Sequence, residues 1–203
     1  MSDAEPLEPF LSHVFKESWE VFKEDPVLYI VAALIQTLLG VFTLGLLLGP
    51  LYIGMVRIIA ARRRGEAAGI GDIFGMAEWG AGIVAFILIA IGVIVGSIFL
   101  ILPGIAFALF ASLTFHAIAL DDDGAVDAIK TSFGVIKDNF ANVFVLMLLL
   151  TVLSMVGSVV WIGSLVTAPF TAVAMTVAYQ RMTQAAPVAG ELSAASGQPT
   201  AQV

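Results

Sequence analysis

Three long stretches of the chain lack any charged side chain, and they dominate its pattern of hydrophobic and polar positions. They run from Val27 to Val56, from Trp79 to Phe115 and from Ala141 to Gln180. One membrane-spanning helix needs about 20 apolar residues, so each stretch is long enough for two short spanning helices joined by a tight turn. The pattern therefore predicts an all-α integral membrane protein with six transmembrane helices arranged as three hairpins.

The nine basic residues indicate how these hairpins face the membrane. If each stretch folds back on itself, all nine lie on one side, and Lys and Arg near helix ends are retained on the cytoplasmic side. This predicts a multi-pass protein of the inner (plasma) membrane with both termini in the cytoplasm. In a competing arrangement Val27 to Leu48 is a single crossing, which would put Lys23 and Arg62 on opposite sides, against this rule.

A segment with helical amphipathic periodicity precedes each hairpin, so the chain repeats one unit three times. Residues 18–25 and 132–139 match in residue type at nearly every position, and residues 71–79 form a weaker counterpart. Because apolar side chains recur at helical spacing in these segments, we expect interfacial helices at the inner membrane surface. The candidate contact residues of these helices are Leu11, Phe15, Trp19, Phe22, Ile129, Phe133 and Ile136.

The repeats define one transmembrane domain, residues 10–182, between two tails. Its three units cover residues 10–64, 70–120 and 121–182. Residues 1–9 form an N-terminal tail. Residues 183–203 are rich in Ala, Pro, Gly, Ser and Gln, so we expect a disordered C-terminal tail.

Aromatic residues and prolines near the expected helix ends add detail. Aromatic rings with a polar tip are common at the membrane interface. Four such residues are expected to form a belt at the inner interface: Trp19, Tyr29, Trp79 and Tyr179.

Each hairpin also carries a proline in its second half. Pro103 is expected to start a helix, whereas Pro50 and Pro169 either start helices or kink them.

The composition mainly excludes certain classes of protein and kinds of chemistry. A chain that is 60% hydrophobic and 12% charged is not typical of a soluble domain. Its net charge of -7 leaves no basic surface for nucleic acid, and the absence of cysteine excludes disulfides and thiolate chemistry. No catalytic, cofactor-binding or metal-ligating set is visible. We expect a non-enzymatic protein without a cofactor, whose partners are membrane lipids together with further copies of itself or another membrane protein.

Few residues are candidates for chemistry. His116 is a weak functional candidate, because an ionisable side chain in a hydrophobic segment often marks a function. Its closeness to Asp121 favours instead a histidine that bonds water or a neighbouring group near the cytoplasmic interface. Arg62, Arg63 and Arg64 are candidates for binding lipid headgroups, although topology alone explains them equally well.

Two pairs of small residues at a spacing of four are candidates for helix packing. They are Gly45 with Gly49 and Gly92 with Gly96. Such pairs allow membrane helices to approach closely. The sequence leaves open whether a contact at Gly92 and Gly96 lies within one chain or between chains.

Several motifs together resemble an uncharacterised bacterial family of polytopic membrane proteins. They are the Ser18-Trp19-x-x-Phe22-Lys23 segment, Leu102-Pro103-Gly104, and residues 121–140 with their Ala-Ile-Lys-x-Ser-Phe core. That family is related to the membrane domain of some glycerophosphoryl diester phosphodiesterases, and the likeness covers most of residues 10–182. The catalytic domain of those enzymes has no counterpart here, so the resemblance implies a polytopic inner-membrane protein without their activity.

Two function classes follow from these observations. The first is a non-enzymatic membrane scaffold, assembly or membrane-organising protein that acts through its amphipathic helices and helix faces. The alternative is a channel or transporter for a small neutral or lipidic solute. Ion-coupled transport is disfavoured because acidic and basic residues are almost absent from the hydrophobic stretches.

Overall fold

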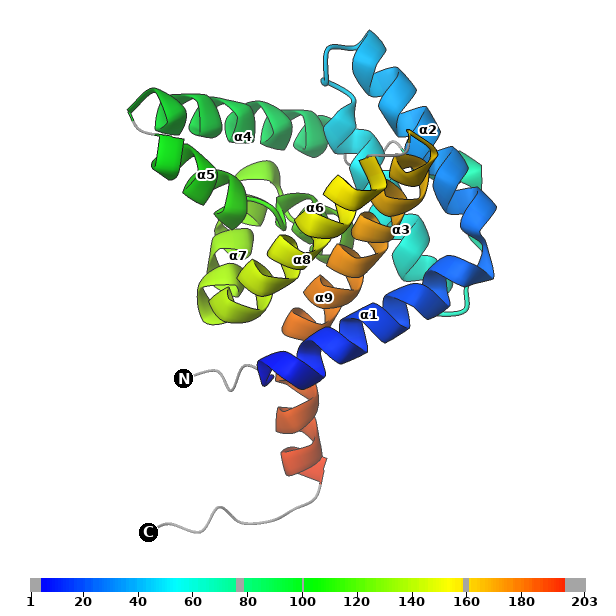
Figure 1. Cartoon of the computed structure of the whole chain (residues 1–203). Helices are drawn as coiled ribbons and strands as arrows, with labels where there is room; N and C mark the ends of the chain where they lie inside the picture. The colour runs from blue at the N-terminus through cyan, green and yellow to red at the C-terminus, as the bar shows by residue number, and fades with distance from the viewer. Residues whose placement is uncertain (1–4, 76–78, 100, 159–160, 196–203) are drawn as a thin grey trace.

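The computed structural model describes residues 5–75, 79–99, 101–158 and 161–195, and their regular structure is helical. The elements are α1 (Leu7–Glu24), α2 (Pro26–Phe42), α3 (Leu48–Arg63), the short 3₁₀ helix η1 (Ile70–Phe74), α4 (Trp79–Phe99), α5 (Ile101–Phe110), α6 (Thr114–Asp121), α7 (Ala125–Asp138), α8 (Phe140–Ser158) and α9 (Trp161–Ala195) (Figure 1). The prediction of an all-helical chain is confirmed.

Within the described residues, three helical segments are long and apolar enough to cross a membrane. They are Trp79–Ile98, Leu102–Asp121 and Phe140–Gly157, and a fourth exists if α1 and α2, bent by 92°, count as one broken span. Three to four of the six predicted crossings therefore have a helix of sufficient length and apolarity. Helices α2 and α3 are shorter, with 17 and 16 residues.

Local sequence signals explain several helix ends. The Asp25 side chain accepts a hydrogen bond from the backbone N–H of Leu28, and Pro26 occupies the first position of α2, where its missing N–H costs nothing. The turn after α2 uses left-handed backbone at Leu44 (φ 52°) and Gly45 (φ 89°). These signals separate α1 from α2 and let α2 and α3 form a hairpin.

The three prolines occupy different helix positions. Pro50 and Pro103 lie in the first turns of α3 and α5. Pro169 lies inside α9, which begins at Trp161. Thus Pro50 belongs to a helix start and Pro169 to a helix interior, a distinction that the sequence left open.

The three repeat units pack in a cyclic order. The units are α1–α2–α3, then η1 with α4, α5 and α6, then α7–α8–α9. The amphipathic segment of each unit packs on the last helix of the unit before it, η1 on α3 and α7 on α6. Helix α1 has no preceding unit and packs on α9, the last helix of the chain. The first and third units are thereby joined, and the order closes on itself.

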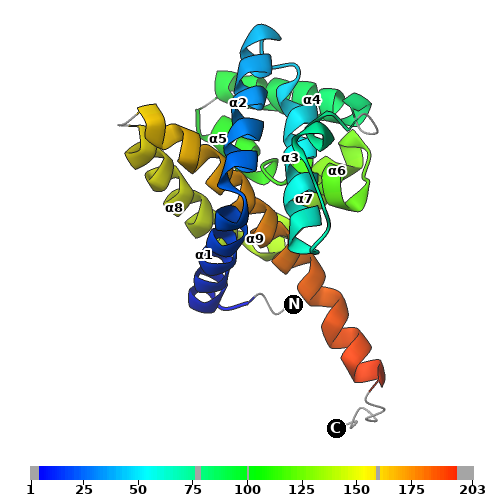
Figure 2. The same cartoon turned by 90° about the vertical axis from the view of Figure 1, so that its right-hand side faces the viewer.

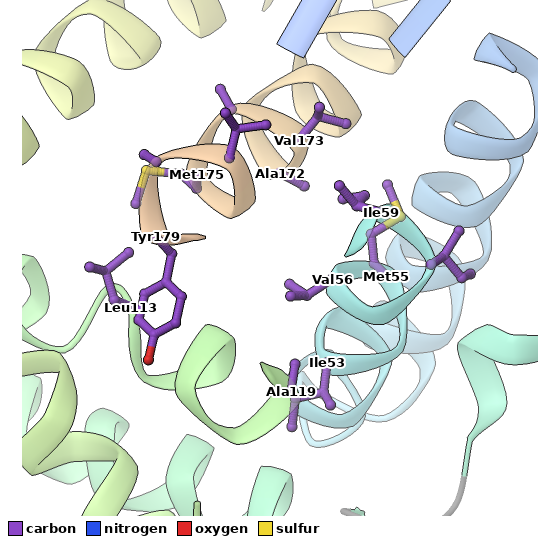
Figure 3. Close-up of a cluster of buried hydrophobic side chains, with 14 of the residues drawn as sticks. Ile53, Met55, Val56, Ile59, Leu113, Ala119, Ala172, Val173, Met175 and Tyr179 are labelled. Carbon is purple, nitrogen blue, oxygen red and sulfur yellow. The ribbon is translucent and has the colours of Figure 1, made fainter. Parts of the chain in front are cut away.

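The last helices of the units form the core. Helix α3 packs against both α6 and α9, and a ring contact between His116 and Tyr179 joins α6 to α9. Apolar side chains from these segments meet between them, as Figure 3 shows for Ile53, Met55, Val56, Ile59, Leu113, Ala119, Ala172, Val173, Met175 and Tyr179. This core holds the candidate residues described below.

The first helices of the hairpins, α2, α4 and α8, each place some side chains in this core and present other apolar side chains outward. In the candidate span of α4 only 11% of the residues are buried. Figure 1 shows α4 and α5 projecting from the rest as a hairpin, and Figure 2 shows α4 running behind α2 and α3, across their direction. Ile91, Leu148 and Leu38 are examples of large side chains that are more than half exposed on these three helices.

Two expectations about the chain's periphery require correction. Tyr29 and Tyr179 are fully buried in the protein interior, so they do not belong to an interfacial belt; sequence position alone does not show which way a ring points. Residues 183–195 continue α9 as a helix, where a disordered tail was expected, and their alanines favour that state. Residues 1–4 and 196–203, the ends of the two predicted tails, lie outside the described residues.

Candidate functional site

The span formed by α5 and α6 is broken in its middle, and a serine from α7 caps the break. The hydroxyl of Ser132 donates to the carbonyl of Phe110 (2.6 Å) and accepts from the backbone N–H of Leu113 (3.1 Å). Both backbone groups would lack a helical partner here, and leaving them unpaired in a buried position is costly. Ser132 therefore fixes the direction in which α6 leaves α5.

Just beyond this break, each of the three core helices contributes one aromatic ring to a common cluster. The ring of His116 on α6 meets the edge of Tyr52 from α3, with centroids 5.5 Å apart, and stacks on Tyr179 from α9 at 5.8 Å. The hydroxyl of Tyr179 donates to the carboxylate of Asp121. His116 is completely buried, and neither ring nitrogen has a hydrogen-bond partner in the described chain.

A network of charged side chains joins Glu17 in α1 to the end of α3 and to Arg181 in α9. Glu17 of α1 accepts hydrogen bonds from Arg63 of α3 (2.8 Å) and from Arg181 of α9. Arg63 also donates to the side-chain oxygen of Gln180, and Arg181 lies 3.6 Å from Glu5. The two arginines and the two carboxylates balance in charge, so this network acts as an electrostatic clamp on α1.

Opposing effects determine the ionisation of Glu17. Partial burial raises the pKa of Glu17, but the hydrogen bonds and positive charges of Arg181 and Arg63 outweigh that effect and bring the pKa below its ordinary value. The carboxylate is thus ionised at neutral pH.

The remaining arginines near this end of the fold also have carboxylate partners. Arg62 pairs with Asp25 at 3.2 Å, and the exposed Arg64 pairs with Glu66 at 2.7 Å. Arg57 donates to Asp122 (2.8 Å) and to the carbonyl of Ala119 (3.1 Å). Lipid headgroups would have to compete with these carboxylates, and binding of headgroups by Arg62, Arg63 and Arg64 stays a prediction.

The predicted contact residues of α1 gather around one ring of α9. Phe15, Trp19 and Phe22 have ring centroids 6.3, 6.5 and 6.0 Å from that of Phe170. Phe22 is buried and Leu11 partly buried, whereas 56% of the Trp19 surface is exposed. These side chains dock α1 on the protein, and Trp19 remains open to the surroundings.

The predicted contact residues of α7 face the broken span. Ile136 is buried, Ile129 is partly buried, and the Phe133 ring stacks on Phe110 at 5.2 Å and meets Phe107 at 5.7 Å. The apolar stripe that predicted an interfacial helix thus contacts α5 and α6.

The predicted packing glycines lie at close helix contacts within the chain. A Cβ atom at Gly49 would lie 2.6 Å from the carbonyl oxygen of Gly82 on α4. At Gly92 it would lie 2.3 Å from the ring of Phe107, and at Gly96 2.9 Å from the backbone of Gly104, both on α5. Gly45 instead serves the turn between α2 and α3.

Metal coordination has little support in the part of the chain that the structure describes. No group of three or more His, Cys, Asp or Glu side chains there is placed to hold a metal ion. The Asp residues at 121–123 engage Tyr179, Arg57 and Thr131.

Sequence reasoning missed the residues that carry long-range contacts. Glu17 and Arg181 are 164 positions apart, and nothing near either residue indicates its partner. The match between residues 18–25 and 132–139 did contain a signal for Ser132, because a polar residue recurs on a buried helix face. Ser18, its counterpart, is likewise fully buried, yet its hydroxyl has no partner among the described residues.

Comparisons with known proteins place most of this structure in one family. A comparison with curated proteins and another with solved structures each found no match. The model of the family described as "Domain of unknown function (DUF7847)" matches residues 27–196. The matched region begins in α2 and includes the core helices and the aromatic cluster, whereas α1 precedes it. The chain therefore belongs to the DUF7847 family of domains of unknown function.

Proposed function

We propose that the chain is a multi-pass inner-membrane protein with six spans and both termini in the cytoplasm. The clustering of charge supports this proposal, since Glu17 of α1 forms ion pairs with Arg63 at the end of α3 and with Arg181 of α9. Helix α2 has 17 residues, which corresponds to about 25 Å at 1.5 Å per residue. A helix of that length spans a bilayer that thins locally around it.

Single cysteines test this topology, because the natural chain has none and gives no background. Leu46→Cys lies in the turn after α2 and Glu66→Cys lies after α3, and both positions are exposed. In intact spheroplasts a membrane-impermeant maleimide should label Leu46→Cys and should label Glu66→Cys only after permeabilisation. Labelling of both from the same side would reject the hairpin.

We further propose that the protein is a non-enzymatic membrane scaffold or membrane-organising protein. The observation that supports this proposal is the outward apolar surface of α2, α4 and α8, which surrounds a core packed mainly by α3, α6 and α9. Exposed apolar surface of this extent is covered by lipid or by other membrane helices. Of the three candidate spans, that of α4 is the least buried, at 11%, so we place the partner contact on α4 and expect lipid to cover α2.

The test compares two outer helices. The chain is isolated in native nanodiscs, and its bound proteins and lipids are identified by mass spectrometry. In one variant Ile91, Ile94 and Ile98 of α4 are changed to alanine, and in the matched control Val31, Leu34 and Leu38 of α2 are changed likewise. The scaffold proposal expects a stoichiometric membrane-protein partner that the α4 variant loses and the control retains. Absence of such a partner, or equal retention by both variants, would count against it.

One observation favours a second function, the passage of a small neutral solute. His116 lies at the centre of the core with both ring nitrogens unpaired in the described chain. The relation to the membrane domains of glycerophosphoryl diester phosphodiesterases stays a prediction.

A further inference from the structure

Among the described residues, the three core helices bring polar-tipped rings together in the aromatic cluster of Tyr52, His116 and Tyr179. Each ring comes from the last helix of a different repeat unit, so the cluster lies at the centre of the cyclic arrangement. In membrane proteins built from repeats, ligand sites often lie where the repeats meet beside a broken helix. Here the break before α6 precedes His116 by only a few residues.

Unpaired polar atoms are concentrated in this short segment. Nδ1 and Nε2 of His116, Oγ1 of Thr114 and Oγ of Ser112 are all inaccessible and lack hydrogen-bond partners in the described chain. Leaving one such atom unsatisfied costs about 1–3 kcal/mol. Packing alone does not explain why a chain would keep several of them within five residues, since an apolar side chain would fill the same space without that cost.

We propose that this segment is a binding site for a small, uncharged, hydroxyl-bearing ligand that the ring nitrogens of His116 hold beside Tyr52 and Tyr179. A neutral imidazole offers one donor and one acceptor that point in different directions, so a separate hydroxyl group, which can donate or accept, is needed to satisfy each nitrogen. The two rings cover the imidazole, so the ligand reaches it at the ring nitrogens and must be small. Water and small polyols share this chemistry.

The surrounding charges disfavour an ionic ligand. Asp121 accepts from Tyr179, while Arg57 of α3 is bonded to Asp122 and to the carbonyl of Ala119. On α7, which also packs on α6, Asp127 and Lys130 pair with each other at 2.9 Å. An anionic ligand beside His116 would therefore lack a free cation, and a cationic ligand would have to displace the Tyr179 hydroxyl from Asp121; either is costly in an apolar core.

Nitrogen NMR of the imidazole tests the site directly. The full chain carries ¹⁵N-histidine in lipid nanodiscs, and His13→Asn removes the only other histidine, an exposed residue paired with Glu5. The proposal expects both nitrogens of His116 at hydrogen-bonded chemical shifts, with magnetisation transfer to the ring N–H from solvent or added glycerol. Transfer from water alone identifies water as the ligand, and transfer from glycerol carbon-bound protons identifies a polyol. An acceptor nitrogen at its unbonded shift, without transfer from either source, would overturn the proposal.

A stability measurement gives an independent answer. If the ring nitrogens of His116 have no hydrogen-bond partner, His116→Phe removes the free-energy cost of burying them unpaired and raises the Tm. If a ligand satisfies it, the folded variant loses those hydrogen bonds and gains no Tm, so a clear rise would overturn the proposal. A variant that does not fold leaves the decision to the NMR experiment. Neither readout involves a partner protein, so this site and the scaffold proposal can fail separately.

Discussion

Replacing Gly54 by alanine is expected to destabilise the protein by about 1–3 kcal/mol, the usual cost of overpacking. A Cβ atom at this position of α3 would lie 2.3 Å from the carbonyl oxygen of Ile73 and 2.7 Å from two further backbone atoms of that residue. Backbone atoms cannot move aside as the end of a flexible side chain can, so η1 would have to move away from α3. Thermal unfolding in nanodiscs, followed by tryptophan fluorescence, measures the effect.

Gly134 provides the matched control for this substitution. It lies in α7, and a Cβ atom there would meet nothing within 4 Å. Gly134→Ala is therefore expected to stabilise the helix by about 0.5–1 kcal/mol. Equal unfolding temperatures for the two alanine variants would contradict the close contact between η1 and α3.

Replacing Glu17 by glutamine is expected to release α1 from the core. The change leaves Arg63 and Arg181 without their shared carboxylate, and losing one partner of a partly buried charged group costs about 1–3 kcal/mol. Hydrogen–deuterium exchange should show faster exchange in α1 than in α3 or α9. Glu20→Gln is the control, because Glu20 is exposed on the same helix, and we expect a change within about 0.5 kcal/mol. Equal exchange in both variants would contradict the clamp.

Acid should act on the same contact. Because the pKa of folded Glu17 lies below its ordinary value of 4.5, the ionised carboxylate contributes stability above pH 4.5, and this contribution is lost as pH falls through the folded pKa. The stability difference between the natural chain and Glu17→Gln should therefore be constant near neutral pH and shrink in acid. A difference that grows on acidification would exclude Glu17 as its cause.

The helices could be predicted from the sequence where a signal is local. Charge-free stretches, Asp25 with Pro26, and the apolar stripes mark α1, α2 and α7 well. The break between α5 and α6 could not be predicted, because residues 110–113 contain neither Gly nor Pro and the stabilising hydroxyl comes from Ser132, far along the chain. Periodicity showed that α1 and α7 have an apolar face, but it could not show that this face covers other helices.

The candidate site was predictable only in part. An ionisable residue in a hydrophobic segment singled out His116, yet its two ring partners come from helices that no pattern connects to it. Position along the sequence predicts an interfacial Tyr179 because Trp and Tyr are common at the membrane interface. Which side of α9 faces the core depends on α3 and α6, and this is a property of the assembled fold.

The packing of α1 on α9 also orders events during synthesis. Helix α1 leaves the ribosome first, but the helix that covers Phe15 and Phe22 and supplies Arg181 is made last. Until then, the apolar face and the Glu17 carboxylate of the newly made α1 lack their final neighbours. An amphipathic helix of this kind binds at the membrane surface, so we expect α1 to lie there until α9 is made. The ring of repeats can close only after the whole domain has been inserted, so a chain that stops before α9 should remain an open, exchange-prone intermediate.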